Sequence, residues 1–281
     1  MKVAFVTGSN KGIGLGIVEK LARYYGSTGE WDVYLTARNE ELGLKSQSDL
    51  ESKGLKVKFH QLDITKPESR KRFLEFMKTN YPDGINIAVN NAGIAYKQDA
   101  TDPFGEQAKV TLNTNFTCTI DFTEEFLPLL SKDARVVNVS SMVSFTTLRK
   151  LSPELYSKFT SPMTMDQLRT HVADFVRHAE LGDHEAHGWP STAYGVSKLA
   201  LTKASFIIGD SIKNDPRHIV LNSCCPGYVD TDMTSHKGVK TVEQGADTPF
   251  YLATLPLGIK EPINQFVSER KIMPWSKDTK F

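Results

Sequence analysis

The sequence predicts an α/β protein in which a doubly wound, mainly parallel sheet carries helices on both faces. Short apolar segments alternate with stretches of helical periodicity, and a glycine-rich turn separates the first apolar segment from the first helical one. Short strands that are apolar on both sides and joined by helices are typical of a parallel sheet covered on both faces. Because such connections are right-handed, the helices wind onto both faces of the sheet.

The expected strands can be placed one after another along the chain. The apolar segments that define them are residues 3–6, 33–36, 57–59, 85–89, 135–139, 219–222 and 265–267. The first helix is expected over residues 13–25, after the glycine-rich turn, and the last apolar segment is expected to close the sheet. No internal repeat or linker marks a second domain, so residues 1–281 are expected to form one domain.

The composition is that of an ordinary globular protein. The 281 residues are 40% hydrophobic and 24% charged, with a formal net charge of +1. A balanced charge gives no reason to expect nucleic acid or an acidic membrane surface as a partner, and no apolar run approaches the roughly 20 residues of a membrane span. Three cysteines and an N-terminus that runs directly into a strand-like segment favour reduced thiols and a cytoplasmic location.

The turn after the first expected strand has features of a dinucleotide site. It reads Thr7-Gly8-Ser9-Asn10-Lys11-Gly12-Ile13-Gly14, and its glycines allow a tight turn and close approach of a ligand. The helix that starts there points free N–H groups and the positive end of its dipole at a pyrophosphate. The spacing is Gly-x-x-x-Gly-x-Gly rather than Gly-x-Gly-x-x-Gly, and a plain strand–helix turn is the alternative interpretation.

The end of the second strand indicates which dinucleotide binds. An acidic residue there would hold the ribose of NAD, whereas an arginine accommodates the 2′-phosphate of NADP. The sequence reads Thr36-Ala37-Arg38-Asn39, without an acid. Arg38 has the guanidinium fork that suits a phosphate, and Lys11 adds a second positive charge. We therefore expect NADP(H), with a plain surface arginine as the alternative.

Tyr194 and Lys198 lie one helical turn apart and therefore on the same face of a helix. A free phenol titrates near pH ~10, and a neighbouring ammonium would lower its pKa. The pattern Tyr-x-x-x-Lys also arises by chance in long helices. Its meaning therefore depends on the motifs that accompany it.

Together these motifs resemble the short-chain dehydrogenase/reductase family, and so a Rossmann-type fold, over essentially the whole chain. They occur in the family's order, each at the carboxyl end of a strand or on the adjoining helix, where doubly wound sheets bind ligands. The motifs are Thr7-Gly8 with Gly12 and Gly14, Asp63, Asn90-Asn91-Ala92-Gly93, Asn115, Ser140-Ser141, Tyr194 with Lys198, and Pro226-Gly227. The closer resemblance is to the animal cytosolic NADPH-dependent carbonyl reductases, over residues 10–15, 59–64, 135–141, 188–191 and 265–269.

The resemblance implies four catalytic residues. Tyr194 would be the general acid that protonates the carbonyl oxygen, and Lys198 would lower its pKa and hold the nicotinamide ribose. Ser141, the second serine of its pair, would donate a hydrogen bond to the substrate oxygen. Asn115 would support a proton relay through water to the lysine. A serine bound to local backbone and a solvent-facing asparagine are the plainer alternatives.

The same resemblance implies the binding residues. Cofactor contacts are expected at Gly8, Asn10, Lys11, Gly12, Ile13, Gly14, Arg38, Asp63, Ile64, Asn91, Ala92, Gly93, Tyr194, Lys198, Pro226, Gly227, Val229 and Thr231. Substrate contacts are expected at Ser141, Met142, Tyr194, Cys225, Tyr228 and Met233. Asn91 has a structural alternative, a bridge between strands, and Cys225 has another, a small buried hydrophobe.

The stretch between the serine and the tyrosine, residues 142–193, is unusually long for this family. Residues 164–167 form a capping-box pattern before an amphipathic helix, and residues 152–154 look like another helix start. By resemblance, this helical insert covers the face on which other members dimerise, so we expect a monomer and one wall of the substrate cleft. Its histidines lack a cysteine or clustered carboxylate at metal-ligand spacing, so no metal is expected.

The sequence therefore predicts an NADPH-dependent enzyme that reduces ketones, aldehydes and quinones. A pteridine reductase of the sepiapterin type is the alternative within enzymes. A non-catalytic NADPH-binding sensor on the same fold is the alternative outside them, and alcohol oxidation is the alternative direction of reaction.

Overall fold

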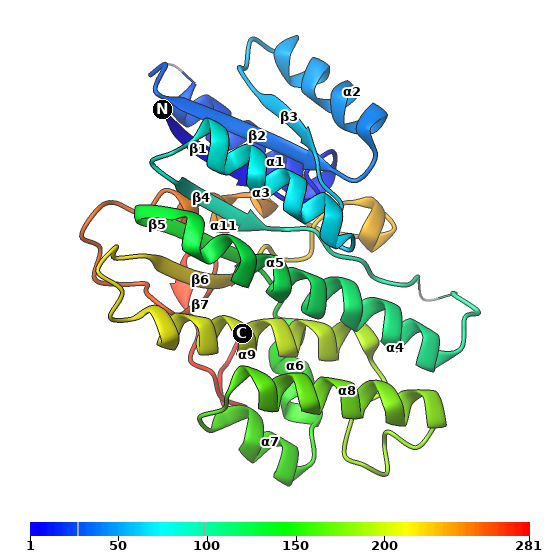
Figure 1. Cartoon of the computed structure of the whole chain (residues 1–281). Coiled ribbons are helices and arrows are strands. Elements are labelled where there is room, and N and C mark those ends of the chain that lie inside the picture. The colour runs from blue at the N-terminus through cyan, green and yellow to red at the C-terminus, as the bar shows by residue number, and fades with distance from the viewer. Residues whose placement is uncertain (27, 98) are drawn as a thin grey trace.

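The computed structural model describes residues 1–26, 28–97 and 99–281, and these form an α/β fold around an eight-stranded sheet (Figure 1). The strand order is β3-β2-β1-β4-β5-β6-β7-β8. All neighbouring pairs are parallel except the last, in which β8 runs antiparallel to β7. The strands are β1 (Lys2–Val6), β2 (Trp31–Ala37), β3 (Lys58–Gln61), β4 (Ile85–Asn90), β5 (Leu130–Val139), β6 (Val220–Cys225), β7 (Phe266–Ser268) and β8 (Lys271–Ile272).

Helices connect almost all of these strands, as the sequence predicted. The α-helices are α1 (Gly12–Tyr25), α2 (Glu40–Glu51), α3 (Pro67–Asn80), α4 (Phe104–Leu112), α5 (Thr119–Phe126), α6 (Val143–Lys150), α7 (Pro153–Thr160), α8 (Met165–Leu181), α9 (Ala193–Ile212), α10 (Val242–Gly245) and α11 (Asp247–Ala253). A π-helical turn, η1 (Asn113–Cys118), joins α4 to α5. Short 3-10 turns are η2 (Leu127–Leu129) and η3 (Asp232–Thr234).

The first strand shows why these strands are apolar on both sides. Side chains alternate between the faces of a strand, and Val3 and Phe5 lie in one hydrophobic cluster while Ala4 and Val6 lie in another. All four are fully buried. Helices α3, α4, α5 and α9 supply residues to the first cluster, and α1 and α11 supply residues to the second. The sheet is therefore covered on both faces, which confirms the predicted fold class.

The expected strands are found within a few residues of their predicted bounds, with two differences. The strand β5 begins five residues early, because its first half is polar and carries no apolar signal. The prediction that residues 265–267 close the sheet is wrong, because β8 lies outside β7. With two exposed residues, β8 is too short to leave a pattern in the sequence.

The insert, residues 142–193, contains the helices α6, α7 and α8, as expected. The hydroxyl of Thr164 accepts a hydrogen bond from the backbone of Gln167, whose side chain returns a hydrogen bond to Thr164 N–H, so the predicted capping box is present. The hydroxyl of Ser152 caps α7, with a proline in its first turn. Both sequence signals therefore mark real helix starts.

Helix α8 packs on α4 and α9 at the lower side of the molecule in Figure 1. Its apolar stripe, which includes Leu168, Val172 and Phe175, is buried. The backbones of α4 and α8 approach so closely that a Cβ on Gly105 would lie 2.6 Å from the Cα of Glu180. The insert thus covers the outer face of α4 and α9. None of the helices in the described part of the chain is both long and apolar enough to cross a membrane.

Candidate active site

The strand order reverses between β1 and β4, because β2 and β3 continue on one side of β1 and β4 to β7 lie on the other. Connections that leave in opposite directions open a crevice at the carboxyl ends of the strands. A cavity of about 410 Å³ lies there, between the glycine-rich turn and the segments that follow β2, β3 and β4. It is lined by the predicted cofactor residues 8, 10–14, 38, 63–64, 91–93 and 231.

The glycine-rich turn suits a pyrophosphate in this cavity. Gly12 has φ +56°, and the atom nearest to an added Cβ would be Thr231 Cγ2 at 3.4 Å, so its backbone is open to the cavity. Helix α1 begins at Gly12 without a side-chain cap and without an acidic residue in its first turn. Its first N–H groups and the positive end of its dipole are therefore available to an anionic ligand.

Arg38 and Lys11, the two positive charges predicted to hold a 2′-phosphate, differ in their surroundings. Arg38 is exposed at the cavity rim. Among the described residues, it makes a hydrogen bond through its main-chain carbonyl, which accepts from the side chain of Gln61. The amine of Lys11, by contrast, lies 2.6 Å from a carboxylate oxygen of Asp232. The guanidinium is therefore the cation that is ready for a phosphate, whereas Lys11 already has a partner.

Asn91 has the structural role that was the alternative for it. Its amide nitrogen donates to the carbonyls of Thr7 and Gly8, at 3.0 and 3.1 Å, and so ties the segment after β4 to the glycine-rich turn. Asn90 is buried and donates to Thr123 and Asn138 at 2.9 and 2.8 Å. Asn91 also lines the cavity. The same side chain thus shapes the turn and borders the space beside it.

The two serines after β5 have different environments. Ser140 is buried, and its hydroxyl is within hydrogen-bond distance of Thr202 Oγ1, at 2.7 Å, and of the carbonyl of Lys198, at 3.2 Å. Ser141 is only partly buried, and its oxygen accepts from Val143 N–H at 3.2 Å. Its hydroxyl hydrogen is not used in that bond, so it is available to Tyr194 or to a ligand. This difference supports the choice of Ser141 over Ser140.

Tyr194 lies near the start of α9, beside Ser141. Desolvation raises the pKa of its phenol to about 12, and the nearby Cys225 thiol adds to the rise, while a hydrogen bond with Ser141 opposes it. The expectation of a depressed pKa is therefore wrong, because burial raises it. The phenol stays protonated at neutral pH, as a proton donor must be.

Lys198 is buried and directed toward the sheet. Its Nζ donates to the carbonyl of Val139 at 2.9 Å and lies 5.7 Å from the centre of the Tyr194 ring. Burial lowers the pKa of this amine to about 8, and the neighbouring thiols Cys224 and Cys225 oppose the shift. The lysine is therefore mostly charged at pH 7 and loses its charge within the range accessible to experiment.

Asn115 occupies the π-helical turn η1, a feature frequent at functional sites. Its amide oxygen accepts from Ile94 N–H at 2.8 Å, and its nitrogen donates to Ile94 C=O at 2.8 Å and to Ser197 at 3.0 Å. An added Cβ on Gly93 would lie 3.2 Å from Asn115 Oδ1 and 3.7 Å from Lys198 Nζ. The solvent-facing alternative for Asn115 is wrong, because the side chain is buried and lies near the lysine.

A second cavity, of about 580 Å³, opens on the other side of Ser141. Its volume is in the range of small-molecule sites. Four of the six predicted substrate residues line it, namely Ser141, Met142, Cys225 and Tyr228. The walls missed by the sequence analysis come from the hairpin β7–β8 and from the end of the chain, where no motif marked them.

Six predicted binding residues do not line the cavity expected for them, among them Tyr194 and Lys198. Met233 lines the cavity of the glycine-rich turn rather than that of Ser141. Gly227, expected at the cofactor, lines the Ser141 cavity. Val229 is buried, with its side chain against Gly245, and lines neither cavity. Pro226 is buried and lines neither cavity.

The histidines of the insert make a contact that the sequence analysis missed. His178 Nδ1 lies 2.7 Å from Asp183 Oδ1, His187 Nε2 lies 3.5 Å from Asp183 Oδ2, and the two rings stack 3.5 Å apart. The expectation that no clustered carboxylate completes a ligand set with these histidines is therefore wrong, because one ligand atom each of His178, Asp183 and His187 lie within 4.8 Å of one another. Arg177 donates to His178 Nε2 at 2.8 Å, which puts the proton of His178 on Nδ1, facing Asp183. This is the geometry of a hydrogen-bonded network.

A doubly wound sheet with a glycine-rich turn at its switch point, and a serine, tyrosine and lysine beside it, is the architecture of a short-chain oxidoreductase. The chain belongs to the short chain dehydrogenase family, whose model matches residues 2–177. It is 45% identical over 276 residues to the NADPH carbonyl reductase 1 of Rattus norvegicus, across 97% of this chain and 98% of that protein. The human protein of the same name is 45% identical over 278 residues, across 97% and 98%.

A solved structure confirms the fold. Salutaridine reductase from Papaver somniferum matches with a TM-score of 0.82 and 28% identity, over 95% of this chain and 99% of that one. The match extends over nearly the whole of both chains, so it includes the region of the insert.

Proposed function

We propose that this protein is an NADPH-dependent carbonyl reductase that converts ketones, aldehydes and quinones to alcohols or hydroquinones. The observation that carries the proposal is the grouping of Ser141, which lines the second cavity, with Tyr194 and Lys198. The Lys198 amine also lies close to Gly93, which lines the glycine-turn cavity. The relatives named NADPH carbonyl reductase, which match over nearly their full length, support the same cofactor and reaction.

The residues at the first cavity fit NADPH. Gly12 and the start of α1 would receive the pyrophosphate, and Arg38 would hold the 2′-phosphate. Residues 63–64 and 91–93 would border the adenosine half, and Lys198 the nicotinamide ribose. When bound, NADPH supplies the hydride for the carbonyl carbon.

Residues of the chain stabilise and then neutralise the negative charge that develops on the substrate's carbonyl oxygen. Ser141 donates a hydrogen bond to the carbonyl oxygen and stabilises negative charge as it develops there. Tyr194 transfers its phenolic proton to that oxygen, which completes the alcohol. The charged Lys198 stabilises the phenolate that is left, and solvent returns a proton to it along the side of Asn115 and Lys198. The net change is one hydride and one proton added to the carbonyl.

The packing of helix α8 favours a monomeric protein. The helix α8 occupies the outer face of α4 and α9, so this face is covered within one chain. We propose that residues 1–281 act as one domain, that the protein is monomeric and cytoplasmic, and that its partner is a small carbonyl compound.

A substrate panel with NADPH tests the proposed function. Menadione, an aromatic aldehyde, an aliphatic ketone and sepiapterin are each followed by the loss of NADPH absorbance, with NADH in parallel. We expect turnover of the quinone and the aldehyde and a strong preference for NADPH. Turnover of sepiapterin alone would favour the pteridine alternative, and tight NADPH binding without any turnover would favour the sensor.

A further inference from the structure

The rim of the Ser141 cavity has an excess of positive charge. Its charged lining residues are Glu269, Lys271 and Lys280. The single negative one, Glu269, is paired with the amine of Lys240 and so is neutralised. No carboxylate in the described part of the chain lies within ion-pair distance of Lys271 or Lys280. Both lysines are exposed and line the cavity, so their positive charge is available to an anionic ligand there.

The position of Lys271 is fixed by a strained hairpin. The strands β7 and β8 are joined by Glu269 and Arg270, which both have positive φ, 51° and 60°. Residues with side chains are rarely found in this region of backbone space, and a two-residue hairpin turn usually places Asn or Gly there. The turn is held by the ion pair of Glu269 with Lys240 and by that of Arg270 with Asp247, at 2.6 Å.

The charged side chains of the hairpin therefore point to different partners. Arg270 is drawn back to α11, where its guanidinium also lies 5.2 Å from the ring of Tyr251. Glu269 is held by Lys240. Lys271, the next residue, is left on the cavity side. Strain of this kind persists only where other contacts stabilise it, and it is concentrated at functional sites.

The second lysine is positioned by the end of the chain. Arg149 of α6 donates to the carbonyls of Lys277 and Thr279, the first at 2.9 Å, and its guanidinium lies 4.4 Å from the ring of Phe281. Trp275 donates its ring N–H to Phe159 C=O at 3.0 Å. The segment 275–281 is thus fastened to the insert, and its last two residues, Lys280 and Phe281, form part of the cavity wall.

We propose that this cavity selects carbonyl compounds that carry an anionic group, with Lys271 and Lys280 holding that group while the carbonyl faces Ser141. The apolar part of such a substrate would lie against Met142, Met273 and Phe281, which line the same cavity. The proposal rests on the proposed function for the reaction itself. The charge selectivity is a separate property that binding alone can report.

A matched pair of aldehydes tests it. The anion 4-formylbenzoate and its neutral methyl ester offer the same ring and the same aldehyde, and both give an alcohol by the same hydride and proton transfer. At low ionic strength we expect the KM of the anion to be about three- to tenfold lower than that of the ester. This is the size of effect that the attraction of two partly exposed lysines can produce. The difference in KM is expected to disappear in about 0.5 M salt, because charges at a surface are screened at that concentration.

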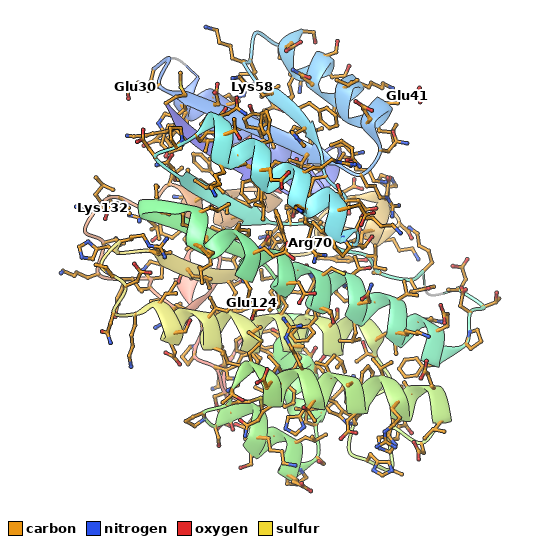
Figure 2. All side chains as sticks on the ribbon, viewed as in Figure 1. Glu30, Glu41, Lys58, Arg70, Glu124 and Lys132 are labelled. Carbon is orange, nitrogen blue, oxygen red and sulfur yellow. The ribbon has the colours of Figure 1, made fainter. Side chains whose placement is uncertain are left out.

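Variants assign the effect to the two lysines. The double variant Lys271→Gln with Lys280→Gln is expected to raise the KM of the anion to that of the ester and to leave the ester unchanged. The matched control is Lys132→Gln, an exposed lysine near the start of β5 that does not line the cavity (Figure 2), and it should alter neither KM. Equal KM values in the wild type, or an equal change for both aldehydes in the double variant, would overturn the proposal.

Calorimetry separates this inference from the proposed function. The alcohol 4-(hydroxymethyl)benzoate and its methyl ester are titrated into the protein without cofactor. Tighter binding of the anion, abolished in the double variant, supports the charge selectivity even if neither aldehyde is reduced, in which case the proposed function fails by itself. Equal binding of the two alcohols contradicts the charge selectivity whatever the turnover.

Discussion

The amine of Lys198 donates a hydrogen bond of 2.9 Å to the carbonyl of Val139, the last residue of β5. This bond joins α9, which carries Tyr194 and Lys198, to the strand end that leads directly into Ser141, so these three side chains are held by connected elements. It also directs the ammonium toward the sheet. Since burial lowers the pKa of Lys198 to about 8 and raises that of Tyr194 to about 12, the lysine titrates first as the pH rises.

The pH profile of carbonyl reduction should therefore report the lysine. Below pH 8 both groups hold their protons, so the proton donor and its supporting charge are present. As the pH passes about 8, Lys198 becomes neutral while Tyr194 remains protonated, and kcat/KM is expected to fall tenfold per pH unit. In Lys198→Arg, whose guanidinium stays charged, the fall should move above pH ~10. A wild-type profile that stays level to pH 10 would contradict this assignment.

The buried amide of Asn115 should be essential for stability as well as for activity. In Asn115→Ala, the backbone N–H and C=O of Ile94 both lose their partner, so we expect a loss of about 2–4 kcal/mol in the free energy of unfolding. Urea denaturation measures it. The matched control is Asn113→Ala, an exposed asparagine in the same π-helical turn, which should cost less than about 1 kcal/mol. Equal losses in the two variants would exclude the proposed role.

Cofactor preference should depend on Arg38. Replacing it with aspartate removes the cation and adds an anion at the cavity rim, so NADPH should bind roughly 30-fold more weakly or worse, about 2 kcal/mol. NADH, which lacks the 2′-phosphate, should change only a few-fold. Fluorescence titration of both cofactors measures the two constants, with Arg72→Asp, an exposed arginine on α3, as the charge-matched control. A parallel loss of both cofactors in Arg38→Asp would remove the phosphate role.

The insert should keep the protein monomeric. Light scattering of the wild type is expected to give the mass of one chain, because α8 already occupies the outer face of α4 and α9. In Gly105→Val, the new side chain would meet the backbone of Glu180 and push α8 from α4. That variant should expose apolar surface and associate with itself, and its insert should be cleaved faster by trypsin. A stable wild-type dimer would show that the insert does not prevent association.

Much of the fold was predictable because its signals are local. An apolar run such as Val3–Val6 is visible in neighbouring residues, and the capping box that starts at Thr164 has a fixed spacing along the chain. The edge strand β8 was missed, because its two exposed residues, which follow a strained turn, carry no pattern. The first half of β5 was missed because its polar residues carry no apolar signal.

The site was predictable to the extent that its residues follow strands in known order. The residues that line the glycine-turn cavity are of this kind, and so are Ser141 and Tyr194. What failed depends on distant contacts. The pKa of Tyr194 is set by burial, Lys11 is engaged by Asp232 from a loop far along the chain, and the lysines of the second cavity are placed by the hairpin and the chain end. None of these contacts is visible in spacing.

In the proposed mechanism Tyr194 donates the proton, and the substitution Tyr194→Phe isolates that step. The change removes one hydroxyl, keeps the ring, and leaves the glycine-turn cavity untouched. We expect NADPH-dependent reduction of menadione to fall at least about 1,000-fold, while NADPH binding, measured by fluorescence titration on the same preparation, stays within a few-fold of the wild type. Turnover at the wild-type rate in Tyr194→Phe would contradict the account.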